Sequence, residues 1–182
     1  IKNQYRSGTC WCFSALSFIE SEVLRTKGYE LDLSEMFVVG KSYRDRAVKY
    51  VRLDGHLNFA AGSSFGDVLH VLDDYGIVPQ DAMPGFNYGT DKPEHNELDT
   101  VLKGYVDGVK KNPNKTLTTA WLRGFDGIVE AYLGEYPETF TYEGVEYTPE
   151  SFRDHIGFNY DDYVNITSFT HHPFYEPFII DV

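Results

Sequence analysis

The chain has 182 residues, of which 42% are hydrophobic, 16% aromatic and 24% charged, and its formal net charge is −12. This composition is typical of a globular protein with a substantial core and excludes a disordered one. The acidic excess disfavours nucleic acid as a partner, because phosphate groups would be repelled. No apolar run approaches the roughly 20 residues that cross a bilayer, so we expect no membrane partner.

Two cysteines, Cys10 and Cys12, lie two positions apart. Residues at this spacing on a helix point in well-separated directions, so we predict free thiols rather than a disulfide. The pair lacks the further ligands that zinc requires, and the six histidines show no metal-binding spacing. We therefore predict neither a metal site nor a cofactor.

Apolar residues predict a helix from Cys10 to about Lys27, ended by Gly28 and apolar around most of its circumference, as a core helix would be. A cysteine at the first position of a helix lies at the positive end of the backbone dipole, which favours the nucleophilic thiolate. Gln4, six residues upstream across a turn, is placed to donate its amide to an oxyanion formed when that sulfur attacks a carbonyl. The alternative is a structural cysteine on an apolar helix.

Gln4, Gly8, Cys10, Trp11 and the following Phe13-Ser14 are in register with the active-site cysteine region of papain-like cysteine peptidases, which the segment resembles. The resemblance implies that Cys10 is the catalytic nucleophile. It also implies that Gln4 and the Cys10 backbone N–H bind the oxyanion, and that Gly8 and Trp11 shape the floor of the site.

Ser7 stands where the family signature has its first cysteine, which many secreted relatives hold in a disulfide. Its absence makes the chain similar to the bleomycin hydrolase and aminopeptidase C branch. That resemblance implies a cytoplasmic location. It leaves a periplasmic or exported protein open, because the chain starts at Ile1 without a methionine.

Residues 58–79 carry a second resemblance, to the papain-family segment in which two glycines precede a helix ending in Tyr-Gly-Ile. Alignment on Tyr75-Gly76-Ile77 places that pair at Gly62-Ser63, where substrate backbone would pair with enzyme backbone. Ser63 departs from the family pattern and puts the second contact in doubt. Ser64 and Phe65 would border the pocket for the second substrate residue. The alternative is an ordinary loop and helix N-cap.

The remaining elements follow from local signals. Leu33-Ser34-Glu35 resembles the family's Leu-Ser-Glu step, and Ser34 would cap a helix running toward Tyr50. Further on we predict helices near Glu94–Lys111 and Thr116–Leu133 separated by Asn112-Pro113-Asn114, a hairpin within Thr139–Tyr147 around Glu143-Gly144, and a short helix capped by Thr148 with Pro149 at its first position.

The fold class implied by the resemblance is α+β, with the helical lobe of a papain-like peptidase followed by a helical insertion. We assign residues 1–85 to the helical lobe with the nucleophile helix, 86–160 to the insertion, and 161–182 to the start of a return to a second, β-rich lobe. Residues 178–182 have the composition of a strand, so we expect the second lobe to be truncated.

Papain-like chemistry also needs a histidine and an asparagine. Asp154-His155 falls at a plausible distance from Cys10, but the short helix around it and the lack of a following Asn-Ser-Trp argue against it. His171-His172 lies in an aromatic segment expected to be extended, and His56, His70 and His95 have no motif around them. The catalytic histidine and asparagine are therefore expected beyond Val182, and the 182-residue chain alone is expected to be inactive.

Three hypotheses about function follow. The first is a cysteine peptidase of the bleomycin hydrolase type, an aminopeptidase acting on peptides through Cys10. The second is an inactive papain-like module that binds peptides along Gly62 without cleaving them. The third is an assembly domain, since the complete protein would form a homo-oligomer if it behaves as some relatives do.

Overall fold

The computed structural model describes residues 2–166 and 168–178. Helices dominate this part of the chain, and the strands form one small antiparallel hairpin. In chain order the elements are α1 (Cys10–Lys27), α2 (Glu35–Arg52), α3 (Phe65–Tyr75), the 3₁₀ turn η1 (Gln80–Ala82), α4 (Asn96–Lys110), α5 (Ala120–Leu133), β1 (Phe140–Tyr142), β2 (Val145–Tyr147), α6 (Pro149–Ile156) and the 3₁₀ turn η2 (Tyr160–Asp162). The mixture is compatible with the expected α+β class.

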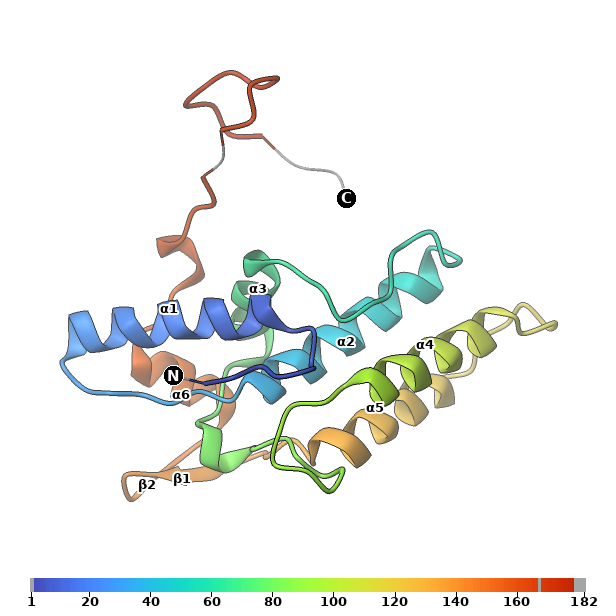
Figure 1. Ribbon diagram of the computed structural model, residues 1–182, viewed down its shortest axis with the longest axis horizontal. Coiled ribbons are helices and arrows are strands. Elements are labelled where there is room, and N and C mark those ends of the chain that lie inside the picture. Colours follow the sequence, from blue (N-terminus) through green and yellow to red (C-terminus); the bar gives the residue numbers. More distant parts are fainter. Residues whose placement is uncertain (1, 167, 179–182) are drawn as a thin grey trace.

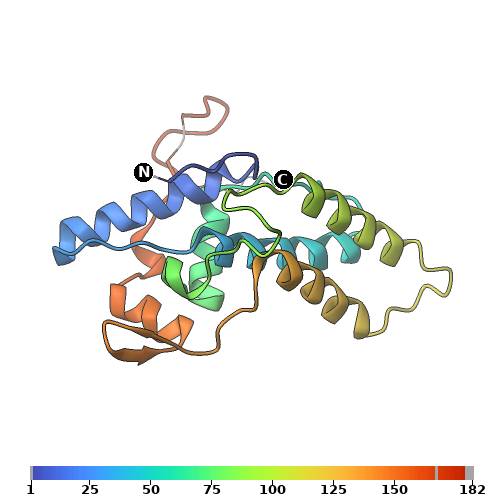
Figure 2. The same ribbon diagram turned by 60° about the horizontal axis from the view of Figure 1, so that its bottom comes forward.

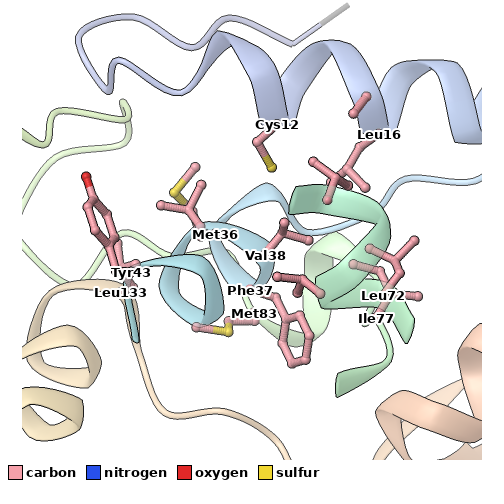
Figure 3. Close-up of a cluster of buried hydrophobic side chains, with 14 of the residues drawn as sticks. Cys12, Leu16, Met36, Phe37, Val38, Tyr43, Leu72, Ile77, Met83 and Leu133 are labelled. Carbon is pink, nitrogen blue, oxygen red and sulfur yellow. The ribbon is translucent and has the colours of Figure 1, made fainter. Parts of the chain in front are cut away.

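Helix α1 has the predicted bounds, and Gly28 ends it in the left-handed conformation. Its inner face packs on α2 and α3, and Figure 3 shows Cys12 and Leu16 of α1 directed into the cluster around Met36 and Val38 of α2. Helix α1 is apolar around most of its circumference, as predicted, but the expected core position is wrong within the described chain, because Phe18 and Leu24 are 46% and 47% exposed. Part of the circumference of α1 is therefore left uncovered by the described residues.

The predicted cap of α2 is confirmed, and α3 begins with a helix N-cap, which is the alternative interpretation of that segment. Ser34 Oγ accepts a hydrogen bond from the N–H of Phe37 and donates one to the carbonyl of Met83, so it joins the start of α2 to a distant loop. At α3, Ser64 and Asp67 form a reciprocal capping box. A capping residue of this kind contributes about 1 kcal/mol, so both helix starts are set by local sequence.

Helices α4 and α5 lie side by side and pack against α2 (Figures 1 and 2). The break at residues 112–114 is confirmed, but α5 begins at Ala120 rather than Thr116, and residues 116–119 form an exposed loop. Leu102 of α4 and Phe125 of α5 belong to the same buried cluster as the core of α1 and α2. Packing is therefore continuous across the predicted boundary between residues 85 and 86, although the assignment of these segments to lobe and insertion remains a prediction.

The hairpin and the helix that follows it are confirmed. The turn of the hairpin has positive φ at both Glu143 (49°) and Gly144 (81°), the conformation that suits a two-residue hairpin loop. Thr148 caps α6 by accepting a hydrogen bond from the N–H of Ser151. The hairpin closes over Phe152 of α6, which is completely buried.

The segment after η2 stands away from the helices (Figure 1), and residues 163–166 and 168–178 contain neither helix nor strand. The expected extended conformation around His171-His172 is wrong, because residues 170–171 and 174–175 form turns. The strand predicted at 178–182 falls largely outside the described residues. Within the described part of the chain, no helix has the length and apolarity needed to cross a membrane.

Candidate active site

Residues 2–9 lead into α1 through a tight turn that presents Gln4 beside the helix start. The N–H of Ser7 donates to the carbonyl of Gln4 over 3.1 Å, and Tyr5 within the turn has a positive φ of 46°. A left-handed tyrosine is unusual and persists only where its surroundings enforce it. The turn is held from outside by residues 93–95, because Arg6 N–H donates to the Pro93 carbonyl and the Arg6 carbonyl accepts from His95 N–H.

The two cysteines have different environments. Cys10 is exposed at the first position of α1, whereas Cys12 is completely buried, with its sulfur 3.5 Å from the carbonyl oxygen of Glu35. Burial raises the pKa of the Cys12 thiol well above its ordinary value. Both thiols are free, as expected, and only Cys10 is available to react with a dissolved molecule.

Cys10 and Gln4 line the same cavity, which has a volume of about 600 Å³. The Gln4 Oε1 atom is buried without a hydrogen-bond partner, and the Nε2 atom has no partner among residues 2–166 and 168–178. The backbone N–H of Cys10 likewise has no partner within the described chain, as expected for the first residue of a helix. Two donors without a described partner therefore belong to residues that line the same cavity as the exposed sulfur.

Carboxylate side chains also line this cavity. Lys2 forms ion pairs with Asp32 (2.5 Å) and Glu35 (2.8 Å), and Glu20 accepts a hydrogen bond from Leu33 N–H. Burial raises the pKa of both Glu20 and Glu35, against the opposing effect of these contacts. Three carboxyl groups against one ammonium give this cavity a negative potential when they are ionised.

The loop that precedes α3 is fastened to the nucleophile segment. Trp11 Nε1 donates to the Ala61 carbonyl over 2.9 Å, and a Cβ on Gly8 would lie 2.9 Å from the Ala61 Cβ. Gly8 also has a φ of 68°, so the close approach and the backbone conformation both require glycine. Next to Ala61, Gly62 is exposed and has open space around it. The predicted site residues Gly8, Trp11 and Gly62 are thus brought together.

The start of α3 is stabilised by contacts of Ser63, Ser64 and Phe65. Ser63 Oγ and Ser64 N–H both donate to Asp67, at 2.5 and 2.9 Å, and the Phe65 ring packs edge-on against Phe18 at 5.6 Å. Burial raises the pKa of the Asp67 carboxyl, but the hydrogen bonds outweigh this effect and lower it overall. The role of Ser63, Ser64 and Phe65 at a substrate pocket stays a prediction.

None of the described histidines lines the Cys10 cavity. His155 is exposed on α6, 3.3 Å from the Tyr147 hydroxyl and against the rings of Tyr29 and Phe152. His70 stacks on Tyr160, and His172 stacks on Phe178. Among the described residues, no group of three or more His, Cys, Asp or Glu side chains is arranged to hold a metal ion.

His95 is completely buried, and both of its ring nitrogens lack hydrogen-bond partners. Burial lowers its pKa to about 4. The unfolded chain, with a histidine pKa of about 6.5, therefore binds the proton first, and stability is lost as the pH falls below about 6.5. Because residues 93–95 hold the turn at Gln4, protonation of His95 would also destabilise the candidate site.

We expect the free energy of unfolding to fall by about 2 kcal/mol between about pH 7 and about pH 5 through His95 alone. Urea denaturation at the two pH values, compared with His95→Phe, measures this contribution, because other titrating groups cancel in the difference. His56→Gln, which changes an exposed histidine, is the control and should keep the wild-type pH dependence. An unchanged pH dependence in His95→Phe would contradict the assignment.

Arg46 on α2 is a site residue that the sequence did not reveal. Its guanidinium donates to the carbonyls of Ala60 and Gly62, the latter over 2.6 Å. Arg46 lies on α2, more than ten residues before this loop in the chain. Burial lowers its pKa, opposed by the negative charges of Asp67 and Asp99. No local motif marks this arginine, since its role depends on where α2 passes the 60–62 loop.

Together these features define a helix-rich α+β unit with a free, exposed cysteine at a helix N-terminus beside an unpaired glutamine amide. No protein-family model matches the chain, and no curated protein matches it. Among solved structures, the crystal structure of PepW from Lactobacillus rhamnosis HN001 has a similar fold, with a TM-score of 0.61 at 20% sequence identity over 89% of this chain. The chain spans 45% of the length of that structure.

Proposed function

We propose that this chain carries the nucleophile half of a papain-like cysteine peptidase of the bleomycin hydrolase and aminopeptidase C branch. The observation that carries the proposal is that an exposed Cys10 and a Gln4 amide without a described partner line the same cavity. The similarity of the fold to PepW, whose name is that of a peptidase, supports the same class. In this proposal residues 1–85 are the helical lobe, 86–160 an insertion, and 161–182 the start of the second lobe.

In the proposed reaction, the Cys10 thiolate attacks the carbonyl carbon of a peptide bond. The resulting oxyanion accepts hydrogen bonds from Gln4 Nε2 and the Cys10 backbone N–H. When the C–N bond breaks, an imidazolium protonates the departing amine, and water then hydrolyses the thioester to regenerate the thiol. We assign the imidazole, and the asparagine that orients it, to residues beyond Val182.

The substrate would lie extended along the exposed backbone of Gly62, with Gly8 and Trp11 forming the floor beneath it. Ser63, Ser64 and Phe65 would border the pocket for the second substrate residue. The carboxylates that line the Cys10 cavity would attract the ammonium group of a free amino terminus, which favours an aminopeptidase. We also propose a cytoplasmic location and a homo-oligomeric complete protein, as in the family branch.

A second candidate is a peptide-binding module without turnover. It is favoured by one observation, the lack of any described histidine at the Cys10 cavity. Such a module would keep the 60–62 loop as a binding edge, and Cys10 would have no imidazole to hold it as a thiolate. Hydrolysis by the complete protein distinguishes the two candidates.

The complete protein should hydrolyse peptides with a free amino terminus and lose this activity when treated with E-64, an epoxide that alkylates catalytic thiolates. The 182-residue chain alone should show no turnover, because it lacks a general acid whose contribution is usually about 10²–10⁴-fold. Release of the amino-terminal residue, measured by chromatography, checks both expectations.

His155→Ala in the complete protein is the matched control and should leave hydrolysis unchanged, because His155 packs against the hairpin. E-64-sensitive hydrolysis by the 182-residue chain, lost in His155→Ala, would place the catalytic histidine at His155 and contradict the proposal. Binding of the peptide by the complete protein without cleavage would favour the module.

A further inference from the structure

The half-buried guanidinium of Arg46 holds a backbone segment rather than a carboxylate. Nη1 donates to the carbonyls of both Ala60 and Gly62, while Nε and Nη2 contact Ser42 at 3.4 and 3.2 Å. Within the described residues Arg46 has no ion-pair partner closer than 4.0 Å. A charged group partly removed from water and used only for neutral oxygens indicates a geometric role rather than pairing of charges.

Aromatic rings fix the orientation of this guanidinium. Its central carbon lies 5.8 Å from the Trp11 ring centre and 5.1 Å from the Tyr43 ring centre. Tyr43 is itself held by a hydrogen bond from its hydroxyl to Asp99, and its side chain is almost fully buried. Arg46 therefore has little freedom to follow a shift of the loop, and the planar fork imposes its own geometry on the loop.

The three carbonyls of the 60–62 loop accept hydrogen bonds from two side chains, Arg46 and Trp11, in alternation. The carbonyls of Ala60 and Gly62 are bound by Arg46, and the carbonyl of Ala61 between them is bound by Trp11 Nε1. Trp11 directly follows Cys10, so the loop is tied to α2 on one side and to the nucleophile helix on the other. A carbonyl oxygen has two lone pairs, so the Gly62 carbonyl retains capacity for one further donor.

We propose that Arg46 is a positioning residue that fixes the backbone of Gly62 relative to Cys10 so that an extended peptide can pair with it. The inference rests on the proposed function in its choice of a peptide as ligand. Arg46 acts on the binding of extended peptides and not on the sulfur. Lysine at this position keeps the charge but loses the planar guanidinium, in which Nε and Nη2 are held by Ser42 while Nη1 reaches the two loop carbonyls.

The test measures peptide affinity separately from turnover. A fluorescein-labelled hexapeptide of alanine and valine with a free amino terminus is titrated by anisotropy onto the complete protein carrying Cys10→Ala, at a temperature where every variant is fully folded. Arg46→Lys should raise the dissociation constant by about tenfold or more, because displacement of a binding edge has effects of this size or larger. Arg52→Lys, an exposed arginine on the same helix, should bind as the parent does.

Amide hydrogen exchange adds a readout specific to the loop. Arg46→Lys should speed exchange at residues 60–64, while the rate of iodoacetamide labelling of Cys10 in the protein that retains this thiol stays unchanged. Unchanged affinity in Arg46→Lys would overturn the inference, and so would equal loss in Arg52→Lys or failure of the parent to bind the peptide. Binding without cleavage by the protein that retains Cys10 would defeat the proposed function alone and leave the affinity ratio to decide the role of Arg46.

Discussion

Replacing Cys10 with alanine should abolish peptide hydrolysis by the complete protein without unfolding it. Cys10 is exposed, so its removal leaves no buried void, and it is the one thiol on the wall of the cavity that Gln4 shares. Loss of the nucleophile of a serine protease reduces kcat on the order of 10⁶-fold, and we expect a loss of similar size here. Initial rates measured with a free amino-terminal peptide, together with the melting temperature, check the two parts of the expectation.

Cys12→Ala is the matched control for this experiment. Its sulfur is completely buried against α2, so the substitution should lower stability and leave turnover per folded molecule near normal. In the unmodified protein, iodoacetamide near neutral pH should label Cys10 first, since burial raises the pKa of the Cys12 thiol. Equal labelling of the two thiols, or activity that survives Cys10→Ala, would remove Cys10 from the nucleophile role.

The parts of the fold that the sequence predicts are those set by neighbouring residues. Ser34 and Thr148 mark the starts of α2 and α6 because each side chain accepts a hydrogen bond from the third residue after it. Glu143-Gly144 defines a hairpin because both residues adopt positive φ. In each case the physical cause lies within a few residues of the signal.

Tertiary packing decides the features that were missed. Nothing near Phe18 or Leu24 indicates that one side of α1 stays exposed, because that depends on which elements cover the helix. The contact of residues 93–95 with Arg6 has a similar cause, since about 90 residues of sequence separate the two segments and no local pattern indicates that they pair.

The candidate site likewise contains residues that the local sequence predicts and a residue that only the fold reveals. Cys10, Gln4 and Gly8 are close in sequence, so their spacing is sufficient to predict that they meet around one helix start. Arg46 contacts the 60–62 loop only because α2 passes beside it. In the sequence, Arg46 cannot be told from any other charged residue on a helix. Residues that hold a loop from a distance therefore need the fold before their role can be inferred.

Replacing Gln4 with alanine should lower kcat by about 10²-fold or more in the complete protein, as for other oxyanion donors, with little change in stability. The small effect on stability has a structural reason. Gln4 Oε1 is buried without a partner, and no hydrogen bond from Nε2 to a described residue would be lost. Removing an unsatisfied polar atom does not expose a new unsatisfied group. Steady-state kinetics and urea denaturation measure the two quantities.

Gln4→Glu separates hydrogen-bond donation from the mere presence of a side chain in the cavity. Glutamate has nearly the same shape but carries no donor when ionised, and its charge opposes the oxyanion as well as the carboxylates that line the same cavity. We expect its kcat to be at or below that of the alanine variant, with partial recovery as the pH is lowered and the carboxylate gains a proton. A Gln4→Glu enzyme as active as the wild type would show that position 4 contributes only shape. Severe unfolding of Gln4→Ala with normal turnover in the folded fraction would assign Gln4 to the stability of the turn before α1 instead.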